Sequence, residues 1–180
     1  MTPDEYIQLK AFARVDGAML SLFWIGSFAC YVGGLSHQPL GLAALFLAVA
    51  SLFFIAKRLQ NFRDYGREGI ISFMRAWAYV ILSFFYAGLL FALAQYIYFA
   101  YLDHGYVFSV IERTMEMPEF NDMMAQYGMG DMAGQMMDEF RRISPIDFAL
   151  HGLTTNITFG IILGMPIAAL LKTSVKIGKQ

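Results

Sequence analysis

The sequence predicts an all-α integral membrane protein, a bundle of four transmembrane helices with a long extracytoplasmic helical segment between the third and fourth spans. Two observations carry this prediction. The chain of 180 residues is 58% hydrophobic and only 15% charged, whereas soluble domains carry about 25% charged residues. The charges are also clustered, so that residues 17–56, 76–102 and 148–171 contain none. Because an α-helix crosses a bilayer in about 20 apolar residues, these runs predict a single membrane domain over residues 1–180.

The first charge-free run is long enough for two spans. It contains the polar tetrapeptide Ser36-His37-Gln38-Pro39, which ends in a helix breaker. We therefore expect a hairpin of two helices, over roughly residues 17–35 and 40–56. Ahead of the hairpin, residues 2–5 form a helix-start pattern. This pattern predicts either an amphipathic helix on the membrane surface or a simple lead-in to the first span.

The second and third charge-free runs predict one span each, over roughly residues 76–101 and 147–171. Between spans two and three lies a basic segment, residues 57–69, in which Lys and Arg alternate with aromatic and apolar residues. Anionic lipid headgroups attract such segments. Because the segment is short and the net charge of the chain is −1, we interpret it as a solvated, lipid-facing loop and not as a nucleic-acid-binding patch.

The distribution of basic residues predicts the orientation. The N-terminal flank, the segment between spans two and three and the C-terminal tail hold ten of the 13 basic residues, namely Lys10, Arg14, Lys57, Arg58, Arg63, Arg67, Arg75, Lys172, Lys176 and Lys179. Short loops rich in Lys and Arg remain in the cytoplasm. This bias predicts that both termini are cytoplasmic and that residues 103–145 lie on the other side of the membrane.

The segment over residues 103–145 is rich in methionine and holds eight of the twelve methionines in the chain. Acidic and apolar positions interleave from Ser109 to Tyr127, Gly128-Met129-Gly130 interrupts the pattern, and Asp131 begins a second stretch that runs to about Arg142. The pattern favours two short amphipathic helices that lie over the outer membrane face or clasp a partner. The alternative is a copper-binding segment, since thioethers are soft ligands suited to Cu(I).

Small residues recur every four positions along the fourth span, at Gly152, Asn156, Gly160, Gly164 and Ala168. Small residues at this spacing let two helix backbones approach closely inside a membrane. The stripe predicts a helix-packing interface. We favour a partner helix from the same chain over one from another protein.

A second face of the fourth span is polar. Asp147, His151, Thr154 and Thr158 follow spacings of four, three and four, which places them on one side of a helix. An acid and an imidazole one turn apart could relay a proton or hold a cation. The alternative is that Asp147, which follows Ser144-Pro145, is the acidic residue of a helix N-terminus.

No phosphate-binding glycine loop, Cys/His metal spacing or nucleophile–base pair stands out in the sequence. We therefore expect no cofactor and no catalytic residues. The leading hypothesis is a non-enzymatic accessory or scaffold protein that contacts a membrane partner or lipid, with a possible homo-oligomer. The alternative is a small transporter or lipid-handling protein that uses the polar face of the fourth span.

The chain also resembles a known family. The resemblance rests on the four-span plan, on Arg63-Asp64-Tyr65 and Gly69-Ile70-Ile71-Ser72-Phe73 ahead of the third span, and on Met117-Pro118-Glu119-Phe120 before Ser144-Pro145. These features are similar to a bacterial four-span family of unknown function, domain of unknown function 4199. The resemblance implies a multi-pass protein of the bacterial inner membrane and transfers no catalytic residues.

Overall fold

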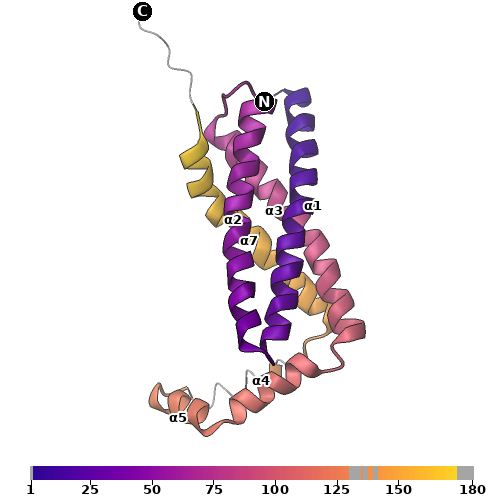
Figure 1. Cartoon of the computed structure of the whole chain (residues 1–180), viewed down its shortest axis with the longest axis vertical. Helices are drawn as coiled ribbons and strands as arrows, with labels where there is room; N and C mark the ends of the chain where they lie inside the picture. Colours follow the sequence, from indigo (N-terminus) through magenta and orange to yellow (C-terminus); the bar gives the residue numbers. More distant parts are fainter. Residues whose placement is uncertain (1, 130–134, 136–137, 140–141, 174–180) are drawn as a thin grey trace, which may run out of the picture.

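A computed structural model describes residues 2–129, 135, 138–139 and 142–173 of the chain. Its helices are α1 (Pro3–Gly34), α2 (Gln38–Gly66), α3 (Phe73–Ile97), the π-helical turn η1 (Tyr98–Leu102), α4 (Tyr106–Glu116), α5 (Pro118–Gln126) and α7 (Pro145–Leu171) (Figure 1). Within the described part of the chain, four helices are long and apolar enough to cross a membrane: α1, α2, α3 with η1, and α7. The predicted all-helical membrane protein with four spanning helices is therefore confirmed.

The helix α1 joins the N-terminal amphipathic stretch and the first span without a break. It begins at a capping box in which the Thr2 hydroxyl accepts from the backbone N–H of Glu5, and the Glu5 carboxylate accepts from the backbone N–H of Thr2. The chain then leaves α1 through a short turn, and Pro39 lies in the first turn of α2. The hairpin expected from the polar tetrapeptide is present.

The prediction of a solvated loop after the second span is wrong. The helix α2 continues to Gly66, and residues 67–72 alone connect it to α3. Ile55, Leu59 and Phe62 lie on one face of this helix and are buried in the core. The apolar residues interleaved with the basic ones therefore belong to a helix face that packs inside the protein, and this burial extends the helix beyond its charge-free run.

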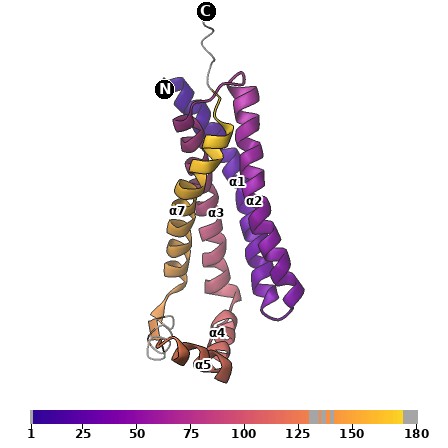
Figure 2. The same ribbon diagram turned by 90° about the vertical axis from the view of Figure 1, so that its left-hand side faces the viewer.

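The helices pack in the order α2, α1, α3 and α7. The helix α1 packs along both α2 and α3, α3 packs along α7, and α2 and α7 touch only slightly. The α1/α2 hairpin and the α3/α7 pair converge at one end and separate toward the other (Figure 2). The convergent end holds residues 2–16, 57–75 and 171–173, and we call it the basic end. Five residues of the buried core lie there, namely Leu9, Ala13, Leu59, Phe62 and Ile71.

Two short helices, α4 and α5, lie across the end of the structure opposite the basic end (Figure 1). The Asp103 carboxylate accepts from the backbone N–H of Val107 at 3.1 Å, and the Ser36 and Tyr106 hydroxyls share a hydrogen bond that ties the α1–α2 turn to α4. The single interleaved stretch expected before Gly128 forms these two helices, because Pro118 starts a new one. The stretch expected from Asp131 to Arg142 lies mostly outside the described residues.

Candidate functional sites

A buried charged cluster joins three helices near the basic end. The Asp16 side chain on α1 is 2% exposed, and the Arg58 side chain on α2 is 30% exposed. Arg58 donates from Nε and Nη2 to Oδ1 of Asp16, and the Tyr79 hydroxyl on α3 donates to Oδ2. The Tyr79 ring stacks on Phe62, with 5.0 Å between the ring centroids. Both oxygens of the carboxylate are therefore satisfied by protein groups.

The helix crossing beside this cluster depends on a glycine. A Cβ atom on Gly17 would lie 2.6 Å from the carbonyl oxygen of Ser83 and 2.8 Å from Cβ of Tyr86. Only a residue without a side chain lets α1 approach α3 this closely. Gly17 thus brings Asp16 within reach of Tyr79, and the paired charges hold three helices together, since a buried charge is costly unless it is paired.

Our reading of the sequence missed this cluster, although the sequence contains a signal for it. Asp16 directly precedes the first charge-free run, and Arg58 follows it after one residue. His37 lies at the turn between α1 and α2, 21 residues from each of them. An antiparallel hairpin places residues equidistant from its turn at the same level, so the spacing brings Asp16 and Arg58 to one level of the α1/α2 hairpin. Tyr79 has no comparable signal, because its position depends on the packing of α3.

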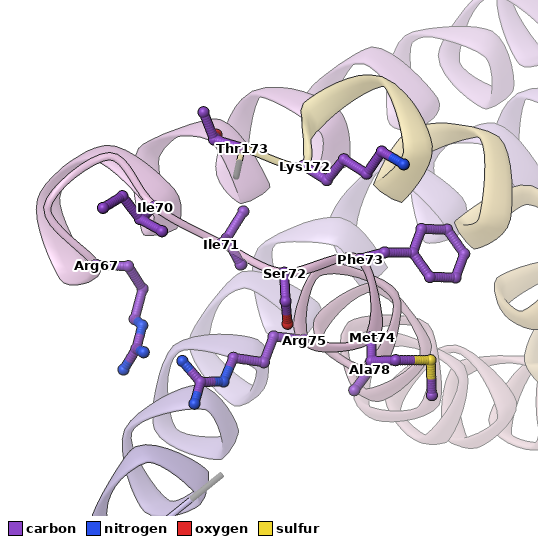
Figure 3. Close-up of a pocket in the computed structure, with 10 residues that line it drawn as sticks. All are labelled: Arg67, Ile70, Ile71, Ser72, Phe73, Met74, Arg75, Ala78, Lys172 and Thr173. Carbon is purple, nitrogen blue, oxygen red and sulfur yellow. The ribbon is translucent and has the colours of Figure 1, made fainter. Parts of the chain in front are cut away.

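A basic cavity of about 1000 Å³ lies at the basic end, between the α2–α3 connection and the end of α7. Its cationic lining residues are Arg67, Arg75 and Lys172, and the α2–α3 connection contributes apolar side chains (Figure 3). The backbone N–H of Thr173 donates to the carbonyl of Ile71 at 2.9 Å, which fixes the end of α7 against the connection.

The carboxylate of Glu5 links α1 to the two arginines of this cavity. Its oxygens accept from Nη2 of Arg67 at 2.8 Å and from Nη2 of Arg75 at 2.5 Å. Glu5 precedes the charge-free stretch of α1 and lies outside the membrane-crossing part of that helix. The hydrogen bond from Arg67, followed by that from the backbone of Thr2 and by the charge of Arg75, lowers the pKa of Glu5 to about 2. Glu5 is therefore ionised at any physiological pH.

An apolar groove of about 600 Å³ opens where the two helix pairs separate. All four spanning helices line it, for example with Phe28 of α1, Leu45 of α2, Phe91 of α3 and Phe159 of α7. Small residues on α2 also line it, namely Gly41, Ala44 and Ala48. A Cβ atom on Gly41 would meet no atom within 4 Å, so the groove is open there.

The polar side chains of the groove differ in whether they have partners. Ser27 donates to the carbonyl of Ala44 at 2.8 Å, and Ser51 donates to the carbonyl of Ala48 and accepts from Nε1 of Trp24 at 3.2 Å. The side-chain amide of Asn156 also lines the groove, and no described residue hydrogen bonds to it. Among the described residues, the Asn156 amide thus lines a mostly apolar groove without a hydrogen-bond partner.

The small-residue stripe of the fourth span faces α3 of the same chain. A Cβ atom on Gly160 would lie 2.6 Å from Phe84, and one on Gly164 would lie 3.1 Å from Trp77. Gly152 lies against Gln95, and Ala168 is buried in the core. Asn156 lies beside this contact and reaches the groove. The stripe therefore packs α7 onto α3.

The polar face of the fourth span points away from the groove. Asp147, His151, Thr154 and Thr158 are all exposed, and none of them lines the groove. Asp147 forms a capping box with Ser144, and the Ser144 hydroxyl donates to the Asp147 carboxylate at 2.6 Å. The two threonine hydroxyls donate to backbone carbonyls one turn earlier, at 3.0 and 2.9 Å. None of these four residues lines the groove or the basic cavity.

Metal-binding groups do not gather in the described part of the chain. There, no three His, Cys, Asp or Glu side chains lie close enough together to hold an ion. Three methionines of the outer segment, Met132, Met136 and Met137, lie outside the described residues. The copper hypothesis stays a prediction.

Comparison with known proteins identifies similarity at the level of a sequence family. No curated protein and no solved structure shows significant similarity to the chain. The sequence model of a family described as "Protein of unknown function (DUF4199)" matches residues 16–173, which include all four spanning helices from Asp16 onward. The chain therefore belongs to the DUF4199 family.

Proposed function

We propose that the protein is a non-enzymatic accessory or scaffold protein whose apolar groove receives a transmembrane helix of another membrane protein. The observation that carries this proposal is the groove itself, which all four helices line and which contains the unpaired amide of Asn156. We further propose, from the positions of the basic residues, that the basic end is cytoplasmic. From the resemblance to a bacterial family, we propose that the membrane is a bacterial inner membrane.

The chemistry of the groove suits a helix. Lipid tails are as apolar as leucine side chains, so helices associate in membranes through close packing and interhelical hydrogen bonds. Gly41, Ala44 and Ala48 offer a small-residue surface on α2, and Asn156 offers a donor and an acceptor from the facing helix α7. A partner helix in the groove satisfies both features. The helices α4 and α5, at the same end as the open part of the groove, provide a further contact surface.

A lipid-handling function is the second candidate, because the lining of the groove is mostly apolar and all of it lies along spanning helices. The volume of the groove falls within the range typical of small-molecule pockets, about 300–1000 Å³. An acyl chain would fill it without using the amide of Asn156. This second candidate uses the groove, which the polar face of α7 does not line; a transport function of that polar face stays a separate prediction.

Photo-crosslinking in native membranes tests the proposal. A photoreactive amino acid at position 48 would lie in the groove, and one at position 169 would lie on an exposed face of α7 outside it. We expect position 48 to form a discrete crosslink to one membrane protein and position 169 to form none. The partner should also co-purify with the wild-type chain in mild detergent and be lost from Ala48→Leu but not from Ala169→Leu.

Other results would contradict the accessory function. A crosslink from position 48 to phospholipid alone would favour lipid handling. A partner retained by Ala48→Leu would place the interface elsewhere. Substitutions at Gly160 or Gly164 are unsuitable for this test, because a side chain there would push α7 away from α3.

A further inference from the structure

We propose that the basic cavity binds the phosphate of an anionic phospholipid headgroup. The cavity carries three cations, Arg67, Arg75 and Lys172, and among the described residues a single carboxylate, that of Glu5, reaches its two arginines. Within the described residues, the nearby Arg63 is occupied by Asp64 and by the carbonyl of Leu171. The cavity therefore keeps an excess of positive charge.

The two arginines retain donors for an anion. Figure 3 shows the guanidinium groups of Arg67 and Arg75 on one side of the α2–α3 connection, with the Ser72 side chain beside Arg75 and Lys172 on the other side of the connection. Glu5 accepts only from Nη2 of each arginine. Nε of Arg67 is buried and has no hydrogen-bond partner among the described residues. A buried donor without a partner is costly, and a phosphate oxygen would satisfy it.

The beginning of α3 adds to the same positive potential. Ser72 occupies the N-cap position of α3, but its side chain makes no capping hydrogen bond. The first backbone N–H groups of a helix carry a partial positive charge and donate hydrogen bonds to anions when no side chain caps them. Ser72, Phe73 and Arg75 all line the cavity, so this helix end reinforces the arginines.

The position of the cavity indicates a lipid as the source of the phosphate. Arg75 directly precedes the charge-free run of α3, and Lys172 directly follows that of α7. Both cations thus lie at the membrane boundary, where basic pockets between spanning helices bind lipid headgroups. Met74 and Ile70, which are 62% and 46% exposed, line the cavity beside the cations. A lipid supplies apolar groups for these side chains, and a free anion does not.

Lipid titration of the purified full-length chain tests this inference. We would titrate the protein in mild detergent with phosphatidylglycerol and with phosphatidylcholine of equal chain length, and measure bound lipid by native mass spectrometry. Phosphatidylglycerol should bind more tightly. Arg67→Gln and Arg75→Gln should each weaken phosphatidylglycerol binding about fivefold. This is the loss in affinity that corresponds to the attraction of one basic residue to an anionic membrane surface, about 1 kcal/mol. Lys57→Gln, an exposed cation outside the cavity, should leave binding unchanged.

Glu5→Gln separates anion binding from a purely structural role of the arginines. The substitution removes the carboxylate that competes for Arg67 and Arg75, so it should strengthen phosphatidylglycerol binding while it loosens α1. If Glu5→Gln weakens binding, the arginines only hold α1 in place and the inference is wrong. The Glu5→Gln titration still tests whether the arginines bind the anion if the arginine variants fail to fold.

Two further outcomes would overturn the inference. Equal binding of phosphatidylcholine and phosphatidylglycerol would show that charge plays no part. Inorganic phosphate that displaces the lipid at equal concentration would show a site for a free anion. Neither outcome depends on the groove or on a protein partner, so this inference can fail while the proposed function stands.

Discussion

Replacement of Arg58 by glutamine should destabilise the protein more than replacement of Asp16 by asparagine. Arg58→Gln leaves the Asp16 carboxylate, whose side chain is 2% exposed, with only the Tyr79 hydroxyl as a hydrogen-bond partner. Loss of one partner from a buried ion pair costs about 3–5 kcal/mol. Because the Arg58 side chain is 30% exposed and solvent screens the pair, we expect the lower end, about 3 kcal/mol.

Asp16→Asn should cost less, because the guanidinium of Arg58 can turn toward water and the asparagine amide can still accept from Tyr79. We expect about 1.5 kcal/mol, the lower end of the range for a lost hydrogen bond to a charged group. The double variant should be less destabilised than the sum of the two single variants, because the second substitution removes a charge that the first left unpaired.

Unfolding of the four proteins in mild detergent by increasing SDS, followed by circular dichroism, gives the required free energies. Asp4→Asn serves as the matched control, since Asp4 is an exposed acid on the same helix. If Arg58→Gln is no worse than Asp16→Asn, or if the two effects add within about 0.5 kcal/mol, the buried pair does not stabilise the basic end as we argue.

Three further predictions concern the helix contacts. Gly17→Ala should lower the free energy of unfolding by about 1–3 kcal/mol, because the added Cβ would lie 2.6 Å from a carbonyl oxygen of α3. The control Gly41→Ala, whose Cβ would meet no atom within 4 Å, should leave the free energy of unfolding unchanged. Equal effects of the two substitutions would contradict the close crossing of α1 and α3. Ser144→Ala should cost about 1 kcal/mol, measured in the same unfolding assay, because it removes the N-cap of α7; an unchanged value would contradict the cap. The pKa of Glu5 is about 2, below its usual 4.5, so its stabilising effect is complete above pH 4.5 and is lost as the pH falls toward 2. The difference in melting temperature between wild type and Glu5→Gln should therefore stay constant from pH 7 to pH 5 and shrink below that range; a difference that vanishes already at pH 5 would refute the ion pairs.

Much of the architecture could be predicted from hydropathy and helix-start patterns. The hairpin followed from the tetrapeptide at residues 36–39, and the capping box of α7 was anticipated by the pattern from Ser144 to Asp147. Such features depend on residues a few positions apart, which interact in any environment. The basic segment was misinterpreted, because the charges at residues 57–69 suggested solvent while the buried faces of Leu59 and Phe62 determined the structure.

The sequence by itself determined that the protein is helical, that four of its helices are long enough to cross a membrane, and where two of them begin. The hydrocarbon of the membrane requires helical structure in the apolar runs, since a backbone in lipid must satisfy its hydrogen bonds within its own helix. Only the tertiary structure decided that the small-residue stripe of α7 faces α3, that Tyr79 completes the pair of Asp16 and Arg58, and that a groove exposes Asn156. These features depend on which helix faces meet and at what angle, and local composition does not specify either.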